Sequence, residues 1–444
     1  MGIWIGLGVF AAILYIVMTA MMIIFERDKP KNIILWSSIF LVTQIVGYLI
    51  YYGSRIVFVK KKKALKRKLE EDDIYHKLIA NNLTGVAMET HDEQYKFNTL
   101  AYGARLTEHN AYEMITDLVE FKDELETATR SAKNIIILEF PHFNFVYFEE
   151  FKNLLIKKSK EGVQIRLVSE NKISRKLKKE LNENGIKFHR FSKYITMGRV
   201  YANHRGVVNI DNKVCYLGNF DIQQKHLAEK ADVVHTFLKL TGEVAQDVGV
   251  ASLEDAVFAS GKFINYQGVE PPANKHVVMQ YVVNEANTDI ELLLINAIRL
   301  AKKSIQLQLN EFIPTESIIS LLRFALNSGI EIRLMIPLKV DRHGKYFASR
   351  AYAKELALYG ATVYLYDGYI RFNAITIDDV QVLTGSYQIN RGHISSSLQN
   401  VLIVEDRAFA DKFTKIFDDC INNSYRINNA KNMLLRERFF KNFV

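Results

Sequence analysis

Hydrophobic residues are concentrated at the start of the chain in two long runs. Residues 3–25 are almost unbroken apolar sequence, and residues 33–52 form a second such run. Each run is long enough to cross roughly 30 Å of hydrocarbon as a helix. The connector between them, ERDKPKN, is short and polar. The pattern therefore predicts a two-helix transmembrane hairpin over residues 1–58.

From about residue 95 onward, short apolar runs alternate with amphipathic stretches, which is typical of an α/β fold. The order strand, helix, strand occurs twice, and in each copy the helix ends at a glycine. The predicted elements are residues 134–140, 148–162 and 163–168 in the first copy, and 304–309, 317–329 and 330–337 in the second.

The recurrence has a constant spacing. Three pairs of residues share one offset of 167 positions: Gly162 and Gly329, Asp211 and Asp378, and Gly218 and Gly385. One offset at three separate anchors indicates a duplicated domain. We therefore predict two tandem α/β domains with pseudo-two-fold symmetry, over residues 95–265 and 276–444. The segment with Pro271 and Pro272 is the predicted linker.

Positive charge is densest directly after the apolar runs. Residues 60–68 (KKKKALKRK) hold seven basic residues in nine, inside a predicted juxtamembrane linker of residues 59–94. Such a cluster keeps its side of a span in the cytoplasm and also attracts anionic lipid headgroups, so both interpretations stay open. The candidates for lipid binding are Lys60, Lys61, Lys62 and Lys63.

The overall balance agrees with this placement. The formal net charge is +9, and its concentration beside the apolar runs favours an anionic membrane surface over nucleic acid as the partner. Two cysteines, Cys215 and Cys420, are too few for a disulfide framework or a cysteine metal cluster. We expect a two-pass plasma-membrane protein with its remaining domains in the cytoplasm, and neither a metal nor another cofactor.

One short stretch carries candidate chemistry. NHRGVVNID places His204 seven residues before Asp211, with Gly206 where phosphate chemistry would favour a cation. The offset of 167 residues assigns Arg371 to the position of His204 and Asn373 to the position of Gly206. Equivalent strands that approach across a pseudo-two-fold axis would place these four positions around one cleft.

Over nearly its whole length the chain resembles the bacterial cardiolipin synthases of the phospholipase D superfamily. The apolar hairpin looks like the membrane entry of that family, and YANHRGVVNIDNKVCYLGNFDI looks like its first phosphatidyl-transfer motif. The second half is closer still, through AKKSIQLQLNEFIPTES and RFNAITIDDVQVLTGSYQIN in the same order. The resemblance implies two phospholipase D-like domains and phospholipids, phosphatidylglycerol and cardiolipin, as partners.

The family chemistry needs two copies of a motif with histidine, lysine two positions later and aspartate five beyond the lysine. One imidazole attacks the lipid phosphorus to form a phosphatidyl-histidine, and the other protonates the leaving alcohol. The lysines neutralise charge on the phosphoryl oxygens. The resemblance implies no metal.

Carried over residue by residue, most of this machinery is substituted. The first copy keeps His204 and Asp211 but has Gly206 at the lysine position, and the second copy keeps only Asp378. Its histidine and lysine positions hold Arg371 and Asn373. Further departures are Asp221 and Gln388 in place of asparagine, and Gln399 and His235 at the positions of the carboxylates behind the imidazoles, with Asp232 near the latter. An arginine stays protonated and cannot act as the matched acid, so we expect transfer to be abolished or severely reduced.

Structural alternatives stand beside each functional assignment. His204 is either a lone nucleophile or a relic that packs locally, and a nucleophile needs partners in place. Asp211 and Asp378 are suited to fixing turn backbone. Arg371 is suited to binding a lipid phosphate without cleaving it, or to a core-edge position. His393 is a candidate replacement acid, and the basic, aromatic segment 431–443 either lies on the membrane or packs on its domain.

Three functions remain open at this level. The first is a non-catalytic homologue that binds anionic phospholipid or partners an active synthase. The second is an active cardiolipin synthase that converts two phosphatidylglycerol molecules into cardiolipin and glycerol. The third is a nuclease-like relative, which the apolar hairpin disfavours. The motif substitutions favour the first.

Overall fold

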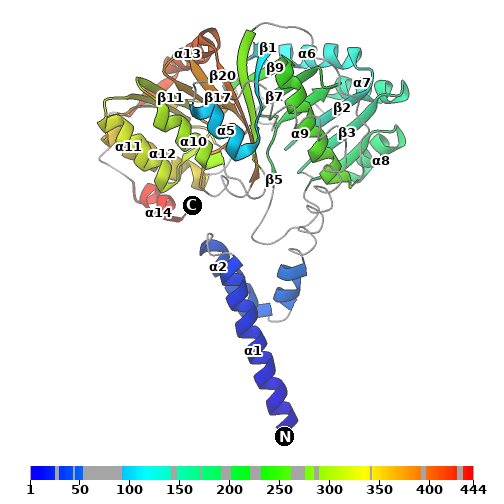
Figure 1. Ribbon diagram of the computed structural model, residues 1–444, viewed down its shortest axis with the longest axis vertical. Helices are drawn as coiled ribbons and strands as arrows, with labels where there is room; N and C mark the ends of the chain where they lie inside the picture. Colours follow the sequence, from blue (N-terminus) through cyan, green and yellow to red (C-terminus); the bar gives the residue numbers. More distant parts are fainter. Residues whose placement is uncertain are drawn as a thin grey trace. The chain divides into compact units, whose positions relative to one another are not determined.

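The structure is a computed structural model of the chain (Figure 1). It describes residues 2–25, 30–43, 46–53, 93–141, 148–170, 173–191, 202–220, 232–261, 276–284, 290–340, 343–391, 397–427 and 434–443. Within these ranges the chain divides into two units, of which one comprises the helices before residue 54 and the other everything from residue 93 onward.

The amino-terminal unit consists of helices α1 (Gly2–Phe25) and α2 (Pro30–Thr43) and a helical segment over 46–53. Aromatic side chains hold the last two together, and Phe40 stacks on Tyr48 with ring centroids 3.9 Å apart. Such pairs add specific geometry to the burial of apolar surface.

Within the described part of the chain, no helix is both long enough and apolar enough to cross a membrane. The transmembrane hairpin predicted over residues 1–58 is therefore not confirmed.

The larger unit is built on one mixed sheet of fifteen strands. Its strands are β1 (Leu106–Ile115), β2 (Ile135–Phe140), β3 (Gln164–Ser169), β4 (Lys187–Arg190), β6 (Val207–Ile210), β7 (Val214–Gly218), β9 (Phe237–Gly242), β10 (His276–Val283), β11 (Ser304–Gln308), β13 (Glu331–Pro337), β14 (Thr362–Tyr366), β16 (Asn373–Ile377), β17 (Gln381–Gly385), β20 (Asn400–Glu405) and β21 (Ser424–Arg426). Their order across the sheet is β21-β14-β13-β11-β16-β17-β20-β10-β1-β9-β7-β6-β2-β3-β4.

The two ends of this sheet are paired in the same way. In the first half β2 is parallel to β3 and antiparallel to β6, and in the second half β11 is parallel to β13 and antiparallel to β16. The halves meet where β1 pairs antiparallel with β10, with Leu106 opposite Gln280. Both predicted domains, 95–265 and 276–444, thus contribute strands to a single sheet.

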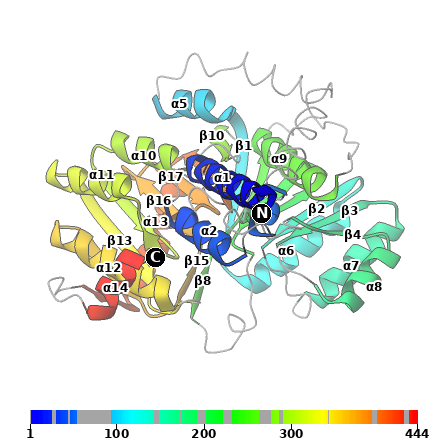
Figure 2. The ribbon, with the colours of Figure 1, turned by 90° about the horizontal axis from the view of Figure 1, so that it is seen from below.

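Helices cover the sheet on both faces, which confirms the predicted α/β class (Figures 1 and 2). They are α5 (Glu93–Tyr102), α6 (Leu118–Ser131), α7 (Glu149–Lys160), α8 (Arg175–Glu183), α9 (Glu243–Ser260), α10 (Ile290–Leu300), α11 (Glu316–Asn327), α12 (His343–Leu358), α13 (Arg407–Ile421) and α14 (Leu435–Phe443). One apolar cluster spans both halves, because Val244 and Val248 of α9 and Phe409 and Phe413 of α13 belong to it together with Met279 of β10. The halves therefore share a core.

The glycines predicted to end the matching helices do so. Helix α7 ends at Lys160 and Gly162 has φ 97°, while α11 ends at Asn327 and Gly329 has φ 87°. Residues with a side chain rarely adopt these backbone angles, so glycine at the end of the helix turns the chain into the next strand.

Six short strands form three further pairs outside the main sheet. They are β5 (Ala202–Asn203) with β19 (Ser397–Leu398), β8 (Val233–His235) with β15 (Tyr369–Arg371), and β12 (Phe312–Ile313) with β18 (Ile389–Asn390). The first two pairs join one half to the other, and they carry the candidate motifs.

Candidate functional site

Each motif strand is held by the opposite half of the protein. Strand β5 pairs in parallel with β19, and His204, just beyond β5, donates its backbone N–H to the carbonyl oxygen of Leu398 at 3.0 Å. Strand β15 ends in Arg371 and pairs in parallel with β8, with Arg371 opposite His235. The region around both motifs is therefore built jointly by the two halves, although a shared cleft of His204 and Arg371 stays a prediction.

Gly206, at the position of the first family lysine, is enclosed by backbone. A Cβ atom there would overlap the carbonyl oxygen of Gly218 and lie 2.8 Å from a ring carbon of Phe220. The two chains are held at this distance because Gly218 donates its N–H to the carbonyl oxygen of Gly206 at 3.3 Å. Interiors are close-packed, so no side chain enters this position unless the β6–β7 pair moves.

Asn373, at the position of the second family lysine, is a buried structural amide. Its Nδ2 donates to the carbonyl oxygen of Tyr387 at 2.6 Å, and its Oδ1 accepts from the backbone N–H of Asn310 at 3.0 Å. Both ends of the side chain thus bind main chain. Arg371, two residues earlier, is buried as well.

The two carboxylate positions hold buried residues that are not carboxylic acids. Gln399 is fully buried, donates from Nε2 to Ser397 Oγ at 2.7 Å, and accepts the backbone N–H of Gln388 at Oε1 at 3.3 Å. Its own backbone N–H donates to Asn284 Oδ1 at 2.6 Å. His235 is buried opposite Arg371.

Asp232 was the alternative carboxylate in the first half. Its Oδ1 accepts the hydroxyl of Tyr366 at 2.6 Å, and its Oδ2 accepts from Asn423 Nδ2. Its backbone oxygen accepts the N–H of Tyr369 at 2.8 Å. These bonds connect Asp232, in the first half, to three residues of the second half.

Asp211 and Asp378 occupy equivalent turns and hold backbone. Their φ angles are 55° and 54°. Each carboxylate accepts from three consecutive backbone N–H groups: those of Lys133, Asn134 and Ile135 for Asp211, and those of Lys302, Lys303 and Ser304 for Asp378. Charge-assisted bonds of this kind are strong. Both aspartates therefore serve the hairpin turn and the start of the neighbouring strand.

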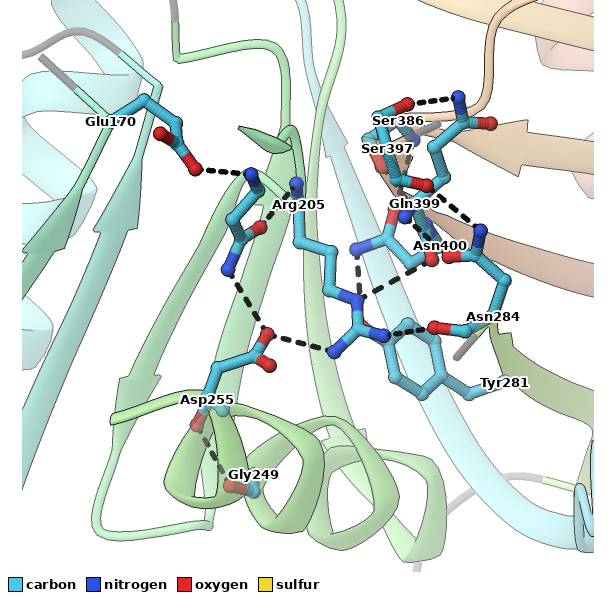
Figure 3. A network of polar contacts seen from close by, with 12 residues as sticks. Glu170, Arg205, Gly249, Asp255, Tyr281, Asn284, Ser386, Ser397, Gln399 and Asn400 are labelled. Atoms are coloured by element: carbon cyan, nitrogen blue, oxygen red, sulfur yellow. Dashed lines mark hydrogen bonds and ion pairs between the residues drawn. The ribbon is translucent and has the colours of Figure 1, made fainter. Parts of the chain in front are cut away.

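Arg205 is a member of the site that the motif reading passed over. Its buried guanidinium lies 2.7 Å from Asp255 Oδ2 through Nη1, donates from Nη2 to the carbonyl oxygen of Asn284 at 2.6 Å, and donates from Nε to that of Gln399 at 3.4 Å (Figure 3). A first-half side chain thus binds second-half backbone beside His204. Side chains alternate between the two faces of an extended segment, so the side chain of residue 205 points away from the face that positions 204 and 206 share. This alternation is the sequence signal that could have predicted a different role for Arg205.

Glu139 on β2 lies against this ion pair. Burial, reinforced by the charge of Asp255, raises the pKa of Glu139 well above its ordinary value. Burial also raises the pKa of Asp255, against the opposing effect of Arg205. Burial is the largest single influence on the pKa of Arg205 and would lower it. The charges of Asp255, Tyr281 and Glu139 and the hydrogen bond with Asp255 together outweigh burial and raise that pKa. The cluster is therefore most stable as an ionised Arg205–Asp255 pair with a proton on Glu139.

Several predicted residues lie outside the described ranges, namely Lys60, Lys61, Lys62, Lys63, Asp221 and His393. Within the described ranges, no group of three or more histidine, cysteine or acidic side chains is arranged to hold a metal ion. Cys215 and Cys420 are both buried as free thiols.

Comparison with known proteins finds similarity to cardiolipin synthases. Residues 294–421 match the model of the cardiolipin synthase, PLD-like domain. The cardiolipin synthase of Clostridium perfringens strain 13 is 25% identical over 423 residues, which cover 88% of each chain. The major cardiolipin synthase ClsA of Bacillus subtilis strain 168 is 26% identical over 449 residues, covering 92% of this chain and 90% of that one.

Two solved structures share the fold. Phosphatidylserine synthase of Haemophilus influenzae Rd KW20 has a TM-score of 0.60 at 9% identity, and the match covers 79% of this chain and 97% of that one. Polyphosphate kinase of Porphyromonas gingivalis has a TM-score of 0.50 at 14% identity, covering 75% of this chain and 52% of that one.

The match of residues 294–421 assigns a cardiolipin synthase, PLD-like domain to this part of the chain, and the two solved structures share its fold. The family match and the relatives along most of the chain confirm the resemblance read from the motifs. The chain thus contains a PLD-like domain and is similar to cardiolipin synthases along most of its length.

Proposed function

We propose that this chain is a membrane-held protein of phospholipid metabolism in which phosphatidyl transfer is abolished or severely impaired. The observation that carries the proposal is the enclosure of Gly206. A lysine at this position is absent from the sequence, and the carbonyl oxygen of Gly218 occupies the space that its Cβ would need. The loss in the first half is therefore built into the backbone.

The chemistry of the second half supports the same conclusion. Transfer requires one imidazole to form a P–N bond as glycerol leaves, and a second group to give that glycerol its proton. Arg371 stands at the second imidazole position, and an arginine side chain does not release a proton to a leaving alcohol near neutral pH. Asn373 binds backbone at both ends of its side chain and supplies no cation to the phosphoryl oxygens.

With these substitutions, the protein could still bind a phospholipid without cleaving it. Arg371 keeps a positive charge at a position that faces phosphate in the family chemistry, and guanidinium groups bind phosphate oxygens through paired N–H donors. We propose phosphatidylglycerol or cardiolipin as the bound lipid, or an active synthase homologue as the partner, with Lys60, Lys61, Lys62 and Lys63 adding attraction to anionic headgroups.

We also propose attachment to the bacterial plasma membrane through the amino-terminal unit, with the rest of the chain in the cytoplasm. The supporting observation is the row of large apolar side chains that α1 and α2 leave exposed, including Ile16, Ile24, Leu41 and Val42. Exposed apolar surface of this extent marks a membrane or protein contact. Retention of the full chain in the membrane pellet after alkaline extraction is the expected result, and release into the supernatant would contradict it.

An active cardiolipin synthase is the second candidate. The observation in its favour is that His204 is kept and that its backbone is bonded to the opposite half. Expression in a host without any cardiolipin synthase separates the two candidates. We expect the lipids of that host to contain no cardiolipin, while an intact synthase expressed in parallel restores it. Cardiolipin that appears with this chain and disappears with His204→Ala would establish the active enzyme instead.

A further inference from the structure

The carboxyl-terminal helix α14 is fixed to its domain along one side only. Its Glu437 is fully buried and lies 2.9 Å from Arg350 Nε and 2.7 Å from Lys354 Nζ, both on α12. Phe440 stacks on Phe347 with ring centroids 5.7 Å apart. The acidic residue and one aromatic ring of the helix are thus used for packing.

The other side of α14 is apolar and basic. Leu435 is 86% exposed and Phe439, one turn later on the same face, is 56% exposed. Arg436 and Arg438 lie between them in the sequence and are exposed. Neither arginine forms an ion pair with a described residue, and the buried Glu437 is the one acidic residue of the helix.

We propose that this side of α14, defined by Leu435, Arg436, Arg438 and Phe439, is a docking surface for an anionic phospholipid bilayer. Leucine and phenylalanine enter the boundary between headgroups and acyl chains, while the arginines bind lipid phosphates. A protein partner would need acidic groups around an apolar pocket, whereas a bilayer that contains phosphatidylglycerol supplies both chemistries at any point of its surface.

The position of α14 determines which side of the larger unit would face the bilayer. Within the larger unit, α14 and strand β5 lie on the same side of the sheet assembly, opposite α6 and α13 (Figure 1). Docking through α14 turns the side that carries the His204 strand toward the lipid. The inference rests on the proposed function only in taking a phospholipid bilayer as the surface.

Lipid-borne quenching tests the docking directly in the full chain. The two native cysteines are buried, so Leu435→Cys provides one accessible thiol for a fluorophore. Val119→Cys is the matched control, because Val119 is an exposed apolar residue, 59% accessible, at the start of α6 on the opposite side. Both variants are incubated with phosphatidylcholine vesicles, with or without phosphatidylglycerol, that carry nitroxide-labelled lipid.

We expect nitroxide lipid to quench the label at position 435 and not at 119, and only when phosphatidylglycerol is present. Arg436→Gln and Arg438→Gln, singly, should weaken this docking about fivefold each, since a basic residue near an anionic surface contributes on the order of 1 kcal/mol.

Equal quenching at the two positions, or quenching that is indifferent to phosphatidylglycerol, would overturn the inference. Protection of position 435 from an aqueous quencher without quenching by lipid would also overturn it, in favour of a second copy or a protein partner. Cardiolipin production is a separate readout. A chain that makes no cardiolipin and fails this test refutes the docking surface alone, whereas a chain that makes cardiolipin and passes it refutes the proposed function alone.

Discussion

The residues packed behind the strand of His204 and behind the strand of Arg371 differ in charge. Behind the first strand, Arg205 is paired with Asp255 and lies beside the buried acid Glu139. The equivalent positions of Arg205 and Glu139 in the second half, by their place in the paired strands, are Phe372 and Gln308. The first half buries charge where the second half buries neutral groups.

The neutral side is packed by sulfur and aromatic groups. Gln308 Nε2 lies 3.6 Å from both Met335 Sδ and Cys420 Sγ, and Phe372 packs near Phe413 with ring centroids 5.9 Å apart. The half that holds Arg371 thus has a neutral backing, and the half that holds His204 has an ionic tie to the opposite half. The difference teaches that the ionic cluster serves the position of the His204 strand, while the fold itself does not require it.

The largest expected effect comes from removing Arg205. Arg205→Ala leaves Asp255 buried without its cation, which should lower the free energy of unfolding by about 3–5 kcal/mol. Equilibrium denaturation measures this loss, and Arg175→Ala on the exposed start of α8 is the control. The double variant Arg205→Met with Asp255→Leu should recover most of the loss, because it removes both charges. A double variant no better than Arg205→Ala would contradict an ionic role.

The second-largest effect is expected at the turn residues Asp211 and Asp378. Their substitution should destabilise the two halves equally, whereas the two motif strands differ. Asp211→Ala and Asp378→Ala each release three backbone N–H groups and should each cost about 2–4 kcal/mol of unfolding free energy. Asp211→Asn and Asp378→Asn should cost less, because asparagine also tolerates positive φ. Thermal denaturation of all four variants measures the comparison, and a loss in one half alone would argue against equivalent turns.

A smaller effect is expected at the lysine positions. Gly206→Ala forces a methyl group against the carbonyl oxygen of Gly218, which should cost about 1–3 kcal/mol. Asn373→Ala removes two hydrogen bonds to main chain without adding bulk, and should cost about 1–2 kcal/mol. Crystal structures of the two variants distinguish the causes, since only Gly206→Ala should displace the β6–β7 pair. A Gly206→Ala structure without displacement, at unchanged stability, would show that the position is open.

The last effect concerns pH and makes the first half resemble the second. Burial raises the pKa of Glu139 above 4.5, so its contribution to folding is complete below that pH and is lost as pH rises toward the folded-state pKa. Glu139→Gln lacks this loss, and its advantage over the native chain should grow by up to about 1.4 kcal/mol per pH unit. Urea denaturation between about pH 5 and about pH 8 follows the difference. A difference that stays constant with pH would mean that Glu139 is ionised in the folded protein.

The sequence predicted the local elements well and their joining poorly. The period of apolar residues and the glycines at 162 and 329 predicted the strand and helix order, because both are local properties of the chain. The pairing of β1 with β10, which makes one sheet of the two halves, has no local signal. The membrane hairpin over 1–58 rested on apolar length alone and is not confirmed.

The same limit applies to the site. The motif spacing located His204, Gly206, Arg371 and Asn373, but it did not show that the neighbouring main chain encloses Gly206. Nor did it predict Arg205 as the tie to the opposite half, because the partners of Arg205 are backbone oxygens nearly 80 and 200 residues away, at Asn284 and Gln399. A hydrogen bond to a backbone oxygen does not depend on the residue type of the acceptor, so the sequence carries no signal for it.

The most direct measurement of the central claim is turnover by the purified full-length protein in vesicles of phosphatidylglycerol. Glycerol release and cardiolipin are counted together, because each cardiolipin formed must release one glycerol. The enclosed Gly206 and the arginine at the second imidazole position predict that both products stay at the level of His204→Ala. Equal amounts of glycerol and cardiolipin, above that level and lost on substitution of His204, would contradict the account.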